Sequence, residues 1–175
     1  REISDMIKIC ELIRHACGEY VVFMGDDDVF VPGALEAYVR FVKKNKGVGY
    51  FLRAYELVHR DGKVEPFKYY GDTVRRFAPG FAALSALFRK GVFISGFTIK
   101  REHVKKCTAT RFDGTLLFQL YLLAEVVLKY PSVYYPEVLV RQYAEGTPLF
   151  GTAAAEKGLP PPAKQAMARI TGSSQ

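Results

Sequence analysis

Hydrophobic and polar positions at the start of the chain change from a helical period to an uninterrupted apolar run. Apolar residues at helical spacing predict an amphipathic helix over residues 2–17, which Gly18 ends. The apolar run from Tyr20 to Met24 predicts a short buried strand. Pro32 is suited to the first turn of a second helix, and Gly47 ends the apolar pattern of that helix. The pattern therefore predicts a helix, a strand and a helix in succession.

The middle of the chain has the pattern of a strand followed by a hairpin. Residues 48–58 predict a strand, and Asp61-Gly62 is a strong two-residue turn that leads into a second strand over residues 64–67. Between Tyr69 and Lys90 the mixture of glycine, proline and apolar residues predicts a loop followed by a short helix over residues 81–88.

The remaining elements predict an α/β fold with a mainly parallel sheet flanked by helices. They are a strand over residues 92–99 interrupted at Ser95-Gly96, a short helix over residues 101–107, a long apolar helix from Thr115 to about Lys129, and strands over residues 133–135 and 138–143.

The composition changes near residue 145. Residues 146–175 are rich in Pro, Ala and Gly and have little pattern, so we expect a tail there, whereas residues 1–145 are expected to carry the functional part. The chain begins at Arg1 inside a helical pattern, which suggests part of a longer protein. Its 175 residues are enough for one domain with a substantial core.

The net charge of +7 favours an anionic partner, such as a phosphorylated small molecule or an acidic membrane surface. No recognised nucleic-acid-binding motif accompanies the basic residues, so we expect no nucleic acid partner. The three cysteines have no CxxC spacing, and no stretch is long and apolar enough to span a bilayer. These features predict a cytoplasmic protein, with peripheral contact to the inner face of the plasma membrane as a hypothesis from charge alone.

Three consecutive carboxylates, Asp26, Asp27 and Asp28, follow the first apolar strand directly. Adjacent like charges at a partly buried strand end raise one another's pKa unless a cation lies among them. Mg²⁺ and Mn²⁺ prefer carboxylate oxygens and commonly bridge to substrate phosphates. The triplet therefore favours a divalent-metal site, although a solvated acidic loop that caps the next helix remains an alternative.

The segment GEYVVFMGDDDVFVPGALEAYVRFV resembles the part of family 2 glycosyltransferases that carries their DxD-type motif, closest to the abequosyltransferase-like branch. The resemblance implies a GT-A fold whose N-terminal nucleotide-binding strands are missing from this chain. It also implies inverting sugar transfer from a nucleotide-diphosphate donor to a saccharide or lipid-linked acceptor in surface polysaccharide biosynthesis. By this resemblance Asp26 and Asp27 would bind the donor, and Asp28 with Asp26 would hold the metal, Mg²⁺ or Mn²⁺.

Two further segments extend the resemblance. FISGFTIKREHV is similar to the strand and turn beneath the acceptor site, so Ser95, Gly96 and Phe97 would line that pocket, although the glycine could instead mark a strand bulge. Asp113 is the carboxylate nearest the position of the family's catalytic base, and an ordinary turn aspartate is the alternative.

The sequence departs from the family at two points. Gly25 stands where the commoner motif has an acid, and the Glu-Asp pair that carries the base in many members is missing. A non-catalytic, truncated or degenerate transferase domain that only binds a partner or a sugar is therefore the main alternative, and this chain alone is expected to be inactive. A metal-dependent phosphotransferase is a third hypothesis, but the chain has no Gly-rich phosphate loop.

Overall fold

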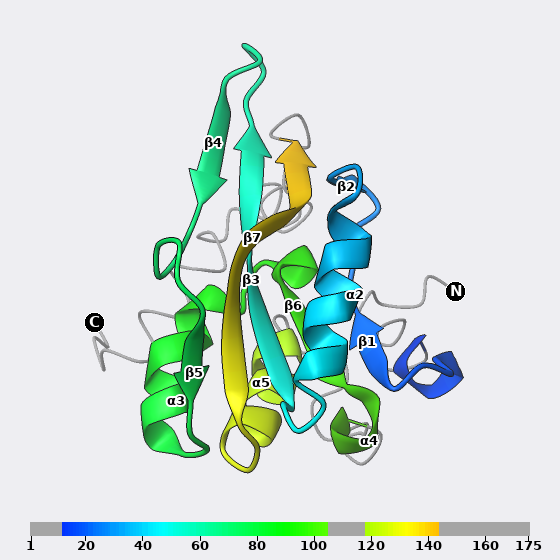
Figure 1. Cartoon of the computed structure of the whole chain (residues 1–175), viewed down its shortest axis with the longest axis vertical. Coiled ribbons are helices and arrows are strands. Elements are labelled where there is room, and N and C mark those ends of the chain that lie inside the picture. The colour runs from blue at the N-terminus through cyan, green and yellow to red at the C-terminus, as the bar shows by residue number, and fades with distance from the viewer. Residues whose placement is uncertain (1–11, 105–117, 144–175) are drawn as a thin grey trace, which may run out of the picture.

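The computed structural model describes residues 12–104 and 118–143, which form a mixed β-sheet flanked by helices (Figure 1). Five strands lie side by side in the order β1, β6, β3, β7 and β2, while β4 pairs with β3 and β5 pairs with β7. Their bounds are β1 Tyr20–Val22, β2 Asp28–Phe30, β3 Tyr50–Val58, β4 Val64–Phe67, β5 Arg75–Phe77, β6 Phe97–Lys100 and β7 Ser132–Tyr143.

The expectation of an α/β fold is confirmed, but the expectation of a mainly parallel sheet is wrong for the described strands. Only β3 and β7 pair in parallel, and the other five pairs are antiparallel. β6 lies antiparallel between β1 and β3, and so separates two strands that run in the same direction. A short, fully buried strand has a continuous apolar sequence in either direction, so the pattern cannot indicate how it pairs.

Where the structure describes them, the predicted helices are helical apart from their ends. They are α2 Ala34–Lys44, α3 Phe81–Leu87, α4 Arg101–Val104 and α5 Phe118–Val127, with the 3₁₀ turns η1 Phe88–Lys90 and η2 Ile94–Gly96. Residues 12–15 are also helical. The helix expected to open at Pro32 begins at Ala34, because Gly33 has a left-handed φ of 73° that turns the chain just before it. No helix in the described ranges is long and apolar enough to cross a membrane.

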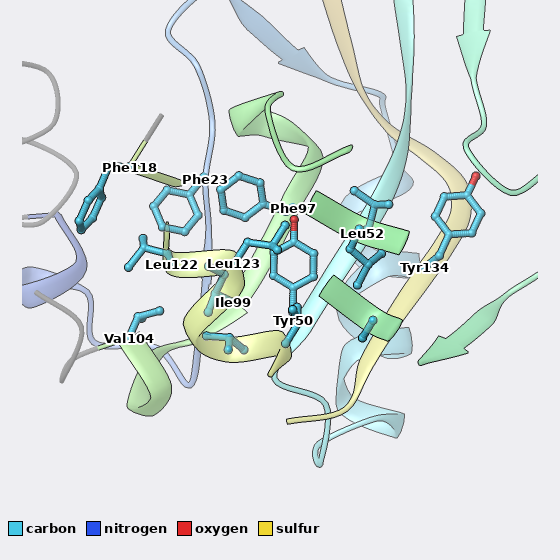
Figure 2. Close-up of a cluster of buried hydrophobic side chains, with 14 of the residues drawn as sticks. Phe23, Tyr50, Leu52, Phe97, Ile99, Val104, Phe118, Leu122, Leu123 and Tyr134 are labelled. Carbon is cyan, nitrogen blue, oxygen red and sulfur yellow. The ribbon is translucent and has the colours of Figure 1, made fainter. Parts of the chain in front are cut away.

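The sheet separates two hydrophobic cores because β3 presents alternate side chains to its two faces. Tyr50 and Leu52 pack with residues of α5 such as Leu122 on one face, the cluster drawn in Figure 2. Phe51 packs against Tyr38 of α2 on the other face. Full burial of each such side chain contributes about 1.5–3 kcal/mol. The helices thus cover both faces of β3 in the middle of the sheet.

Gly49, just before β3, lies at a point of close approach between the sheet and α5. A Cβ atom there would lie 2.7 Å from Cβ of Tyr130 and 2.9 Å from Cγ1 of Val126. Its N–H donates to the carbonyl of Pro131, and its carbonyl accepts from Lys100 N–H, so the backbone cannot move away easily. Because Gly49 has no side chain, the amino end of β3 can pack closely against Val126 and Tyr130.

We expect Gly49→Ala to lower the free energy of unfolding by about 1–3 kcal/mol through overpacking. Gly47→Ala is the matched control, because a Cβ at Gly47 would meet no atom within 4 Å. Chemical denaturation of both variants provides the measurement, and equal stabilities would contradict the close packing at Gly49.

Candidate functional site

The acidic segment forms a tight turn between two strands of the sheet. Asp26 and Asp27 lie in an exposed turn after β1, whereas Asp28 is half-buried as the first residue of β2 and pairs with Gln142 of β7. The N–H of Asp28 donates to the carbonyl of Gly25 at 3.5 Å, which closes the turn. The predicted carboxylates therefore project from the turn that joins β1 to β2.

Three polar side chains converge over Gly25. A Cβ atom on this residue would lie 2.9 Å from Oδ2 of Asp28, 3.0 Å from Oδ1 of Asp27 and 3.4 Å from Oγ of Ser95. The space in which a side chain at position 25 would begin is thus already occupied by oxygen atoms. A side chain at position 25 would therefore require the flexible carboxylate ends of Asp27 and Asp28 to shift.

Ser95 connects the turn to the middle of the sheet. Its hydroxyl donates to Oδ2 of Asp28 at 2.5 Å and accepts the N–H of Gly25 at 2.7 Å. Ser95 is buried in η2, directly before β6, and β6 pairs with β1. The structure therefore brings together Ser95, expected at the acceptor site, and Asp28, expected at the metal site.

Burial is the main influence on the charge of Asp28. It raises the pKa of the Asp28 carboxyl above its ordinary value, the hydrogen bond from Ser95 lowers it, and the neighbouring charges of Asp27 and Asp26 raise it. The Oδ1 atom of Asp28 is buried and accepts no hydrogen bond from residues 12–104 or 118–143. A nearby positive charge would therefore stabilise the anionic form of this side chain.

Arg53 of β3 supports the segment that carries Ser95. Its side chain is fully buried, and Nη2 donates to the carbonyls of Ser95 at 2.5 Å and Phe97 at 2.9 Å. The guanidinium carbon lies 5.3 Å from the ring centroid of Tyr38, a cation–π distance. Sequence analysis did not identify Arg53 as a site residue, although its charge within the otherwise apolar run of residues 50–55 indicated an unusual position.

The other two predicted acceptor residues lie in the interior. Gly96 is buried, and Phe97 packs its ring 5.0 Å from Phe23 and 5.6 Å from Tyr50, measured between centroids. The Phe97 side chain is fully buried in the core. The geometry therefore gives Phe97 a packing role and does not support direct contact of its side chain with an acceptor.

Aromatic side chains gather near the acidic turn. The ring of Tyr55 lies 4.3 Å from that of Phe93 and 4.9 Å from that of Phe67, and Tyr69 is 6.1 Å away. Burial raises the pKa of Tyr55, a hydrogen bond with Tyr69 lowers it, and the charge of Asp28 raises it. These rings form an aromatic cluster within electrostatic reach of Asp28.

A shallow polar hollow lies elsewhere, lined by Glu19, Lys100, Arg101 and Glu102. Glu19 directly precedes β1, whereas the aspartates follow it, so the hollow and the acidic turn lie at opposite ends of this strand. The side chains of Lys100 and Glu102 already form an ion pair at 2.8 Å. The convergence of oxygen atoms over Gly25 therefore makes the acidic turn the stronger candidate for chemistry.

The donor atoms at the turn fit part of a site for a hard divalent cation. Within residues 12–104 and 118–143, no group of three or more His, Cys, Asp and Glu side chains could hold a metal ion. Mg²⁺, however, is commonly bound through one or two carboxylates, with water and substrate phosphates completing the shell. Asp27 and Asp28, with the free Oδ1 of Asp28, provide such a partial set. Asp113 lies outside the described residues.

No protein-family model and no curated protein matches the chain.

Asp28→Asn should make the protein more stable at neutral pH. Because the folded-state pKa of Asp28 is raised, the folded protein binds this proton more tightly than the unfolded chain does. The stability contributed by the neutral carboxyl is therefore present at pH values below the ordinary pKa of 3.8 and is lost as the pH rises through the folded-state pKa. Asparagine stays neutral throughout, so the Tm of Asp28→Asn should exceed that of the wild type at pH 7 and approach it under acidic conditions.

Thermal melts of both proteins without divalent metal, from acidic to neutral pH, measure this difference. Glu137→Gln removes an exposed carboxylate of β7 and is the matched control. A gap between Asp28→Asn and the wild type that stays constant with pH would show that burial does not govern this carboxyl.

Proposed function

We propose that this chain is the metal- and acceptor-binding part of a GT-A-type glycosyltransferase. The enzyme would move a sugar from a nucleotide-diphosphate donor to a saccharide or lipid-linked acceptor with inversion, in surface polysaccharide biosynthesis. The observation that carries the proposal is the convergence of Asp27, Asp28 and Ser95 over Gly25, at the end of a strand in the sheet. The likeness of the surrounding segment to family 2 glycosyltransferases supports the choice of reaction.

Asp28 and Asp27 are the residues that would hold Mg²⁺ or Mn²⁺, and the exposed Asp26 is available to the metal or to the donor. A bound divalent cation supplies charge stabilisation for the diphosphate leaving group. The Ser95 hydroxyl fixes Oδ2 of Asp28, whereas Oδ1 is buried and has no hydrogen-bond partner among the described residues, so a cation would have to reach it by a small movement of the turn. Burial keeps this carboxylate costly to ionise until a cation is present, so binding and ionisation are coupled.

The acceptor would be activated by a carboxylate base. Asp113 is the proposed base on the sequence resemblance, and it would take the proton of the acceptor hydroxyl as that oxygen attacks the anomeric carbon. Direct displacement by one attacking oxygen inverts the configuration at that carbon. The aromatic cluster around Tyr55 offers apolar ring surface near the turn, to which the face of a sugar ring could bind.

The metal proposal is tested by titrating Mn²⁺ into the wild type, Asp28→Ala and Ser95→Ala, with binding measured by calorimetry. We expect Asp28→Ala, which removes a ligand, to bind at least about a hundredfold more weakly. Ser95→Ala keeps the carboxylate but loses its hydrogen bond, so a loss of about tenfold is expected.

Glu137→Ala, an exposed carboxylate in β7, should bind Mn²⁺ as the wild type does. Equal Mn²⁺ affinity in Asp28→Ala and the wild type would contradict the proposed metal site. Metal binding without release of nucleoside diphosphate from any nucleotide-sugar, by the full-length protein, would favour a binding module over an enzyme.

The base is tested with Asp113→Asn in the full-length protein. A general base is worth about 10²- to 10⁴-fold in rate, so the transfer rate should fall by at least about a hundredfold while Mn²⁺ affinity is unchanged. A turn or capping aspartate would instead shift the free energy of unfolding by about 1 kcal/mol and leave the rate nearly unaltered. The latter result would assign the base to another residue.

A further inference from the structure

The surface helix α3, together with the adjoining turn η1, has an outward face with almost no polar character. Its exposed residues before the terminal basic pair are Phe81, Ala82, Ser85 and Phe88, which recur at helical spacing. Phe81 is 79% exposed and Phe88 is 38% exposed. The opposite face, with Ala83 and Leu87, is buried in the core. The helix is therefore apolar on both sides although only one side is packed.

The contrast with α2 shows that this is not the general pattern of surface helices in the molecule. α2 buries Tyr38 and Val42, and its exposed positions include the charged residues Glu36, Arg40 and Lys43. Leu35 and Val39 of α2 are also partly exposed, but charged side chains lie among them. A helix that is hydrophobic all round is ordinarily buried. The outward face of α3 thus has the composition of a surface that contacts another molecule in the functional state.

The stretch of sequence that contains this face carries basic residues but no acidic ones. The sequence has no acidic residue between Asp72 and Glu102. The charged groups of Arg75 and Lys90 both lie over the ring of Tyr70, at 4.9 Å and 5.0 Å from its centroid.

Tyr70 connects these cations to the helix, because its hydroxyl donates to the carbonyl of Ala86 in α3 at 2.8 Å. Arg89 is exposed beside Phe88. Cations therefore border the apolar face, and the exposed apolar side chains of Val74 and Val92 lie in the same acid-free segment.

We propose that the outward face of α3 and η1 docks on the surface of an anionic lipid bilayer. Apolar side chains of an amphipathic helix enter the boundary between headgroups and acyl chains, while cations remain among the anionic headgroups. A bilayer accepts a protruding side chain such as Phe81 without a matching pocket, whereas an acidic protein surface would need one. This inference is independent of the sugar-transfer reaction.

The proposal is tested by sedimenting the protein with phosphatidylcholine vesicles that contain or lack phosphatidylserine. We expect the wild type to bind the phosphatidylserine vesicles preferentially and to bind less well at high salt. Phe81→Ser combined with Phe88→Ser should reduce the partition coefficient at least about tenfold, because the two largest apolar contacts are lost. Arg89→Gln should reduce it about threefold to tenfold through the lost charge.

Val64→Ser is the matched control, because Val64 of β4 is 47% exposed and lies outside the α3 segment. Thermal melts of all variants confirm that they fold. Failure of the wild type to bind, binding that ignores phosphatidylserine, or equal binding by the phenylalanine variant would each overturn the proposal. Self-association of the wild type that is lost in the phenylalanine variant, without vesicle binding, would overturn it in favour of a second copy of the chain.

Discussion

The hydroxyl of Ser95 is the contact on which the organisation of the candidate site depends. It binds the N–H of Gly25 and the carboxylate of Asp28, which are 70 and 67 residues away along the chain. This double contact requires β6 to lie beside β1. Arg53 fixes the position of Ser95 separately, by donating hydrogen bonds to the carbonyls of Ser95 and Phe97. The acidic turn is therefore shaped by the interior of the sheet as well as by its own three aspartates.

Burial acts in opposite directions on the two charged groups of this network. It lowers the pKa of Arg53 and raises that of Asp28, so the charged form of each residue is disfavoured. Nε and Nη1 of Arg53 and Oδ1 of Asp28 all lack hydrogen-bond partners in the described structure. Such unmet polar groups cost folding energy, and natural sites commonly accept this cost where a ligand later compensates it.

Sequence reasoning succeeded where local chemistry decides the structure. Asp61-Gly62 correctly predicted a hairpin between β3 and β4, although the turn closes between His59 and Gly62. The apolar run after Gly18 correctly predicted a strand, but β1 is shorter than expected, lies at the edge of the sheet and is only partly buried. It failed where partners come from distant segments: β2 and β5 are three-residue strands whose pairing with β7 leaves no periodic pattern. The contact between Ser95 and Asp28 was likewise hidden, because it depends on the antiparallel insertion of β6. Arg53 could be noticed as a charge in an apolar strand, but its two carbonyl partners could not be predicted.

The parallel pairing of β3 with β7 has a consequence for how the chain folds. It joins Tyr50 to Ser132 and continues to Val58 and Tyr143, so its partners are about eighty residues apart. Non-local pairing of this kind requires closure of a long loop before any contact is gained, which slows folding. During synthesis β3 leaves the ribosome well before β7, so β3 is at first without the strand that pairs along its whole length. The centre of the sheet is therefore completed late, and apolar surface exposed until then favours aggregation of the newly made chain.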